Sequence, residues 1–254
     1  MEIYGIFAQV YDKFMQAPYE DWADFIEGLW EKHTTNSAKP NLVLDLACGT
    51  GSMSQILAAR GYETIGIDAS AEMLAVAHQK DNATLYLLQD MRSFELYGSV
   101  DAIICLCDSL NYILDYDELM KVFALCANYL NPGGMLIFDI NTEYKYSKIL
   151  ANNNFSHTEE DAAYIWENFY DEDERLNEYQ ATFFIQQKNG FFARHEELHV
   201  QKAYSYLEIE QALSQAGLAF IASYDEESKA SPTPGSERVF FVAKRGGDRT
   251  ELPH

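Results

Sequence analysis

Basic side chains are scarce in this sequence. The 254 residues include 18 lysines and arginines against 40 aspartates and glutamates, so the formal net charge at pH 7 is -22. A protein with this charge repels polyanions, which disfavours bare nucleic acid as a partner and leaves neutral or cationic ligands open. We interpret the acidic runs at 159–161, 171–174 and 225–227 as solvated surface, so the charge limits the partners without choosing one.

Membrane and metal signals are missing as well. No apolar run approaches the roughly 20 residues of a membrane-spanning helix, and the amino terminus, with Glu2 and Asp12, lacks the layout of a signal peptide. We therefore expect a soluble, cytoplasmic protein without membrane contact. The cysteines lack zinc-finger spacing, so we expect no metal site and predict reduced thiols at Cys48, Cys105, Cys107 and Cys126.

Short apolar strands alternate with amphipathic segments in the first half of the chain. This pattern is typical of βαβ units and a parallel sheet. It predicts strands at 42–46, 64–67, 85–88, 100–106 and 135–140. Helices are expected between them at 52–60, 71–79 and 119–130, the last of which Asn131-Pro132-Gly133-Gly134 stops.

The rhythm changes after Ile140, where alternating aromatic segments predict an antiparallel insertion. Its strands are expected at 164–170, 179–187 and 191–203, with a hairpin turn at Lys188-Asn189-Gly190. The chain is then expected to return to the core through a helix at 206–215 and strands at 218–224 and 238–244.

These elements predict an α/β fold: a Rossmann-like, doubly wound, mostly parallel seven-stranded sheet with an antiparallel β insertion after the fifth strand. Because no internal repeat or linker divides the chain, residues 1–254 are expected to form a single domain. Its expected parts are a helical cover at 1–38, a cofactor-binding half at 41–140, the insertion at 145–203, a return to the sheet at 204–244 and a tail at 245–254.

A glycine turn follows the first strand, in the segment Asp45-Leu46-Ala47-Cys48-Gly49-Thr50-Gly51. Rossmann-like proteins hold a nucleotide cofactor at this position, because glycines let the backbone approach a ligand closely. A turn that serves packing alone is the alternative. The second strand ends at Asp68, whose carboxylate could accept ribose hydroxyls or could cap the next helix in competition with Ser70.

The chain resembles class I S-adenosylmethionine-dependent methyltransferases in four successive motifs: 45–51, Gly66-Ile67-Asp68, Gln89-Asp90-Met91 and 130–134. More narrowly, 7–15, 108–112 and 197–201 resemble a bacterial group usually encoded beside the ribosome-silencing factor. The layout is also similar to sugar-amine N,N-dimethyltransferases and to glycine N-methyltransferase. The resemblance implies a methyltransferase domain with S-adenosyl-L-methionine as cofactor and S-adenosyl-L-homocysteine as product, and it brings no established acceptor.

The resemblance also implies roles for single residues. Asp45 would lie near the amino group and sulfonium of the cofactor, and Asp68 would accept both ribose hydroxyls. Asp90 would contact the adenine amino group while the Met91 backbone reads the ring edge; a plain turn aspartate is the alternative for Asp90. The Tyr11 hydroxyl would reach the methionine carboxylate, unless its helix face only packs. The expected cofactor-binding residues are Tyr11, Asp45, Ala47, Gly49, Gly51, Asp68, Ala69, Met73, Asp90, Met91, Leu106 and Cys107.

The fourth strand delivers the loop at 108–112 to the carboxyl edge of the sheet, where open α/β folds bind ligands. We expect this loop to face the methyl acceptor and the insertion at 145–203 to form the acceptor side. An in-line displacement depends mainly on alignment, and an amine or hydroxyl acceptor also requires a base. The expected catalytic residues are Asp108, Tyr112 and His199, with turn bracing and cross-strand pairing as alternatives.

We therefore predict a methyltransferase that modifies a small molecule at an amine or hydroxyl, with a protein acceptor left open. No signal specifies an oligomeric state. A noncatalytic cofactor-binding protein that acts in assembly or at the ribosome is one alternative. A nicotinamide-dependent oxidoreductase is another, and Ser54 opposes it because this serine stands where the third glycine of G-x-G-x-x-G would fall.

Overall fold

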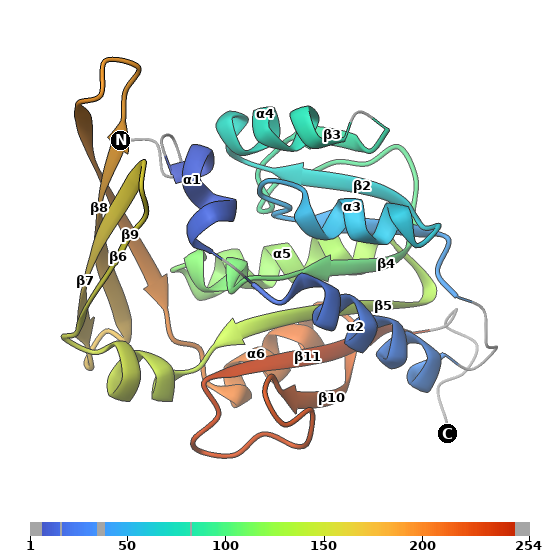
Figure 1. Cartoon of the computed structure of the whole chain (residues 1–254). Coiled ribbons are helices and arrows are strands. Elements are labelled where there is room, and N and C mark those ends of the chain that lie inside the picture. Colours follow the sequence, from blue (N-terminus) through green and yellow to red (C-terminus); the bar gives the residue numbers. More distant parts are fainter. Residues whose placement is uncertain (1–6, 16, 35–38, 82, 247–254) are drawn as a thin grey trace, which may run out of the picture.

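Two β-sheets organise the chain (Figure 1). The computed structural model describes residues 7–15, 17–34, 39–81 and 83–246, so parts of the expected cover and most of the expected tail lie outside the described residues. The larger sheet has the strand order β10-β11-β5-β4-β1-β2-β3. Its strands are β1 (Leu42–Leu46), β2 (Glu63–Asp68), β3 (Leu85–Leu88), β4 (Val100–Cys105), β5 (Leu130–Asn141), β10 (Leu218–Asp225) and β11 (Arg238–Arg245).

The strand order creates a ligand-binding edge. β1 to β5 run parallel, while β11 pairs antiparallel with both β5 and β10. The chain moves outward from β1 through β2 to β3, then crosses back to β4 and continues to β5. Open α/β sheets bind ligands at such a reversal, beyond the carboxyl ends of the strands, which here is the edge between β1 and β4.

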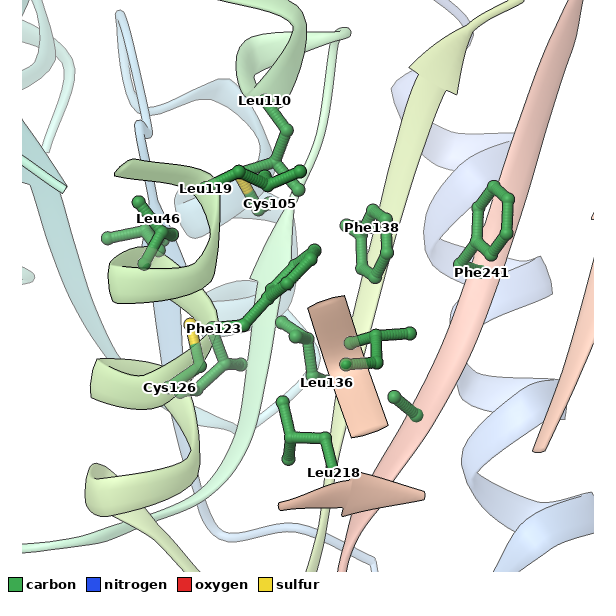
Figure 2. Packing of buried hydrophobic residues seen from close by; sticks show 14 of the residues in the cluster. Leu46, Cys105, Leu110, Leu119, Phe123, Cys126, Leu136, Phe138, Leu218 and Phe241 are labelled. Carbon is green, nitrogen blue, oxygen red and sulfur yellow. The ribbon is translucent and has the colours of Figure 1, made fainter. Parts of the chain in front are cut away.

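Helices cover both faces of the larger sheet. The helices described outside the insertion are α1 (Phe7–Phe14), α2 (Tyr19–His33), α3 (Ser52–Ala59), α4 (Ala71–Lys80), η1 (Ser109–Tyr112), α5 (Tyr116–Tyr129) and α6 (Tyr206–Gln215), of which α1 packs against the insertion. Alternate strand residues point to opposite faces, so Val43 packs with α2 and α3, whereas Leu44 packs with α5 and α6. Figure 2 shows the second layer, in which Phe138 of β5 lies between Phe123 of α5 and Phe241 of β11.

The helix expected at 119–130 begins earlier, at Tyr116. The Asp115 carboxylate accepts the N–H of Glu118 at 3.0 Å and so caps the helix one turn before its apolar stripe starts. The segment at 131–134 ends the helix as expected, and it belongs to β5, which begins at Leu130 rather than at Met135.

The insertion forms the second sheet, in the strand order β6-β7-β8-β9, after β5 as predicted. It consists of the π-helix η2 (Lys145–Leu150) and the strands β6 (Asn154–Thr158), β7 (Ala162–Asp171), β8 (Leu176–Gln186) and β9 (Phe192–Lys202). The sequence analysis missed η2 and β6. Every residue of β6 is exposed, so no alternation of apolar and polar residues marks it. The predicted fold class is confirmed.

One helix and one side chain join the two sheets. α1 lies between them (Figure 1), and Phe7 stacks on Phe183 of β8 with ring centroids 4.7 Å apart. The side-chain amide of Asn111 donates to the carbonyl oxygens of Asn141, at 3.2 Å, and Lys202, at 2.8 Å. One asparagine therefore fastens both ends of the insertion. No helix within the described ranges is long and apolar enough to cross a membrane.

Candidate functional site

A cavity of about 720 Å³, here the large cavity, lies at the edge between β1 and β4. Its volume is within the range of small-molecule sites. All the expected cofactor-binding residues except Gly51 line it, namely Tyr11, Asp45, Ala47, Gly49, Asp68, Ala69, Met73, Asp90, Met91, Leu106 and Cys107. The structure thus brings together residues from α1, the glycine turn, α4 and the ends of several strands.

The glycine turn has three residues in the left-handed region: Ala47 at φ 60°, Gly49 at 54° and Gly51 at 71°. A Cβ on Gly49 would meet no atom within 4 Å, so there is open space beside this glycine on the cavity wall. A Cβ on Gly51 would collide with the hydroxyl group of Tyr86 on β3, so this glycine serves the packing of the turn. The binding and packing interpretations therefore apply to different glycines.

Asp45 is buried at the end of β1 and accepts a hydrogen bond from the Ser54 hydroxyl at 2.6 Å. Burial raises the pKa of Asp45 to about 6, and the Ser54 hydrogen bond opposes that rise. Ser54 lies in the first turn of α3 and was missed as a site residue. Its hydroxyl orients the carboxylate, so the residue that opposed a dinucleotide site also shapes this one.

Asp68 ends β2 and braces the glycine turn. Its carboxylate accepts the backbone N–H of Gly49 and that of Ser70, both at 2.8 Å. Burial raises the pKa of Asp68, and these hydrogen bonds partly offset the rise. Ser70 rather than Asp68 caps α4, since its hydroxyl accepts the N–H of Met73 at 3.1 Å. The Asp68 carboxylate is therefore left at the cavity wall with a fixed orientation.

Asp90 follows β3 at the rim of the large cavity. The Arg92 side chain holds it through Nε, which lies 3.0 Å from each carboxylate oxygen, and these bonds lower the pKa of Asp90. Arg92 also reaches Glu118 at 3.2 Å. Met91 lines the same rim. Arg92, which the sequence analysis did not single out, keeps the carboxylate ionised and in place.

The amino-terminal helices close the large cavity from one side. Asp12 of α1 accepts a hydrogen bond from the Thr50 hydroxyl at 2.6 Å and pairs with Lys80 of α4. Tyr11 of α1 and Tyr19 of α2 line the cavity. The expected cover is thus joined to the glycine turn itself.

A second cavity of about 380 Å³, here the small cavity, adjoins the first. Three residues, Tyr11, Cys107 and Tyr112, line both cavities. The core and the insertion both contribute to its wall, which includes Asp108, Asn141, Lys145, Trp166, Tyr179, Gln201, Glu226 and Arg238. The structure therefore has two adjoining cavities with a common boundary.

Asp108 lines the small cavity within a charged network. Its carboxylate accepts hydrogen bonds from Arg238 Nη2 and Gln201 Nε2, both at 2.6 Å, while Arg238 also pairs with buried Asp139. Cys107 and Asp108 have consecutive positive φ angles of 58° and 50°, a conformation that non-glycine residues adopt only when their surroundings hold it. The network thus holds the strained turn between the two cavities.

Tyr112 and His199 lie together, as a separate group. The Tyr112 hydroxyl is 3.1 Å from His199 Nδ1 and shares a short hydrogen bond with the Tyr179 hydroxyl. His199 Nε2 lies 3.4 Å from Glu197 Oε2, and Glu197 Oε1 accepts the N–H of Phe7 at 3.1 Å. His199 is fully buried and lines neither cavity, whereas Tyr112 faces both. Tyr179 lines the small cavity alone, so Tyr112 is the member of this hydrogen-bonded group that lies on the boundary between the two cavities.

S-adenosylmethionine suits the donor set of the large cavity. Its amino group and sulfonium are positive, and the buried Asp45 carboxylate, with its raised pKa, is stabilised by a cation. Its ribose hydroxyls would suit an acceptor such as the Asp68 carboxylate on the cavity wall, and the open space at Gly49 leaves room that a Cβ would fill.

Comparisons with known proteins agree with this geometry. A methyltransferase-domain family model matches residues 43–134. The YqeM protein of Bacillus subtilis, named as a methyltransferase, is 35% identical over 96% of this chain and 97% of its own length. The crystal structure of an S-adenosylmethionine-dependent methyltransferase from Clostridium acetobutylicum superposes with a TM-score of 0.85 at 34% identity, covering 96% of this chain and 99% of that one.

A more distant relative is the dTDP-4-amino-2,3,4,6-tetradeoxy-D-glucose N,N-dimethyltransferase of Saccharopolyspora spinosa, 29% identical over 52% of this chain and 53% of its own length. Together the matches confirm the predicted fold class, the predicted cofactor and the resemblance, and they give no support to a nicotinamide-dependent enzyme. The chain belongs to the class I S-adenosylmethionine-dependent methyltransferases.

Proposed function

We propose that this enzyme methylates an amine or hydroxyl group of a small molecule bound in the small cavity. The shared wall of the two cavities, formed by Tyr11, Cys107 and Tyr112, carries the proposal because it lets a nucleophile on one side face a methyl group on the other. The cavity volume of about 380 Å³ suits a small metabolite. The Saccharopolyspora relative is named for N-methylation of an amino sugar, which is a precedent for a small amine.

In this proposal the large cavity holds the cofactor through residues at the strand ends. Asp45 faces the positive groups of its methionine portion, Asp68 accepts the ribose hydroxyls, and Asp90 with Met91 borders the adenine. When bound, S-adenosylmethionine supplies an electrophilic methyl carbon on a sulfonium sulfur. The chain contributes orientation, which in the best-aligned cases is worth about 7–11 kcal/mol of the barrier.

Tyr112 is the proposed proton acceptor. Its oxygen takes the proton from the attacking group while its own phenolic proton passes to His199 Nδ1, 3.1 Å away. The resulting imidazolium is stabilised by the Glu197 carboxylate at 3.4 Å from Nε2. Asp108 is a positioning residue in this scheme, because Arg238 and Gln201 already engage its carboxylate.

Transfer of a tritium-labelled methyl group from S-adenosylmethionine to a cell extract tests the acceptor class. The label is expected in the low-molecular-mass fraction, and Tyr112→Phe should reduce it. Label that appears instead in protein or in ribosomes would contradict a small-molecule acceptor.

We also propose a cytoplasmic location, since Cys48, Cys105, Cys107 and Cys126 are free thiols.

A further inference from the structure

Lys145 brings a positive charge to the small cavity. It begins the π-helix η2, directly after β5, and its ammonium donates to Asn141 Oδ1 at 3.0 Å. Lys145 lines the small cavity, whereas Lys148 on the same helix is exposed and lines neither cavity. The charge of Lys145 therefore faces a space for a ligand.

The two cations of this cavity differ in their partners. Arg238 pairs with Asp108 and Asp139 and lies 3.5 Å from Glu226. Lys145, by contrast, has no salt bridge within the described part of the chain. Burial and the nearby charge of Arg238 lower the pKa of Lys145. The carboxylates of Asp108, Glu226 and Glu237 act on Lys145 from beyond salt-bridge distance and oppose this lowering. A largely buried ammonium without a directly paired carboxylate is unfavourable, and an anion from a ligand would relieve it.

Aromatic rings form an apolar wall of the same cavity. Trp166 stacks on Tyr179 with centroids 4.3 Å apart, and Tyr179 stacks on His199 at 4.6 Å. The Trp166 indole is held by a hydrogen bond to Asn168 Oδ1 at 3.1 Å. Phe7, Phe14 and Trp22 add further apolar lining. Because Trp166 and His199 cover the two faces of Tyr179, this tyrosine offers its ring edge to the cavity, and the wall as a whole is an apolar surface.

We infer that the methyl acceptor is a small organic acid, a conclusion that rests on the proposed function of this cavity. Its anionic group pairs with Lys145, its apolar body packs against Trp166 and the ring edge of Tyr179, and its nitrogen or oxygen nucleophile faces Tyr112. The net charge of -22 disfavours polyanions, but a single carboxylate or phosphate meets a local cation here. The carboxylates of this cavity already have partners within the chain: Asp108 accepts from Arg238 and Gln201, and Glu226 accepts from the Trp22 indole and lies 3.5 Å from Arg238.

Calorimetry on the protein loaded with S-adenosylhomocysteine tests this inference with four benzene rings that carry one substituent each: benzoate, phenyl phosphate, benzamide and benzylamine. We expect benzoate or phenyl phosphate to bind more tightly than benzamide and benzylamine, and the stronger of the two identifies the anionic group. Lys145→Met should weaken that binding at least about tenfold, because it removes one partner of a buried charge pair. Lys148→Met is the matched control and should change it less than about twofold.

Binding of S-adenosylhomocysteine is measured first in the same samples. If it fails, the proposed function fails. If it succeeds and is unchanged in Lys145→Met, any loss of acid binding lies on the acceptor side. The inference is overturned if benzylamine binds more tightly than both acids, if neither acid binds, or if Lys145→Met binds them as the wild type does.

Discussion

The strand ends around the large cavity and the walls of the small cavity position their polar groups in different ways. At the large cavity the partners are close in sequence, as Asp45 is to Ser54 and Asp90 is to Arg92. At the small cavity they are far apart, as Asp108 is from both Gln201 and Arg238. Contacts between near neighbours follow from a local motif, whereas distant pairs depend on how the insertion and the last strand pack on the core. The large cavity therefore rests on local motifs and the small cavity on tertiary contacts.

The largest effect on stability is expected for Arg238→Met, at the place where the two regions meet. The guanidinium holds Asp108 and Asp139, so its loss leaves buried carboxylates without a cation. The free energy of unfolding should fall by about 3–5 kcal/mol in urea denaturation. Arg194→Met, which removes an exposed pair with Glu196, should cost less than about 1 kcal/mol. Equal stabilities of the two variants would contradict a structural role for the network.

Tyr112→Phe tests the role of the boundary between the two cavities. It keeps the ring and removes the hydroxyl that bonds His199. If Tyr112 takes the proton, the rate of methyl transfer should fall about a hundredfold or more, with little change in stability. The pH dependence of the rate should change as well. Tyr97→Phe, at an exposed tyrosine, is the control and should transfer methyl groups at the wild-type rate.

Gly51→Ala and Gly49→Ala separate packing from binding within the glycine turn. Both residues have positive φ, but a Cβ would strike Tyr86 only at Gly51. Gly51→Ala should therefore lower the free energy of unfolding by about 2–4 kcal/mol, and Gly49→Ala by only about 1–2 kcal/mol. Calorimetry should show that Gly49→Ala weakens the binding of S-adenosylhomocysteine by more than its small loss in the free energy of unfolding explains. The assignment is wrong if Gly51→Ala is the more stable variant.

The smallest expected effect is the pH dependence at Asp45. Burial raises the pKa of Asp45 from its usual value of 3.8 to about 6. Protonation of this carboxyl therefore stabilises the fold below the pKa of the unfolded state, and that contribution is lost as pH rises through about 6. A cationic ligand requires the opposite form, the carboxylate. Affinity for S-adenosylmethionine should therefore fall below pH 6, by at most about tenfold per pH unit. Calorimetry of Asp45→Asn should give a flatter profile; an equally steep one would assign the titration to another group.

The donor side could be predicted from the sequence because its signals are local. Asp45, Asp68 and Asp90 each follow an apolar strand, and a parallel sheet brings such ends to one edge. Ser54 was missed, although its place in the first turn of the helix after the glycine turn is a readable signal. The exclusion of Gly51 from the cavity was not readable, since it depends on contact with Tyr86 on another strand.

The acceptor side resisted prediction because its partners are distant in sequence. Arg238 and Asp108 are 130 positions apart, and no periodicity connects them. Lys145 lies in a π-helix, for which the polar stretch after β5 gives no pattern. The strand β6 has no buried face, so its sequence shows no alternation of apolar and polar side chains. Tertiary contacts decide these positions, so the structure was needed to find them.

The two hydrogen bonds that the Asn111 amide donates also bear on how such enzymes diversify. The insertion leaves the core at Asn141 and returns at Lys202, and a single amide holds both points. A segment whose ends meet can be lengthened, shortened or exchanged with little disturbance to the scaffold that carries it. The insertion is in this sense a replaceable segment, and in the proposed scheme its exchange would change what the enzyme modifies while keeping the same methyl donor.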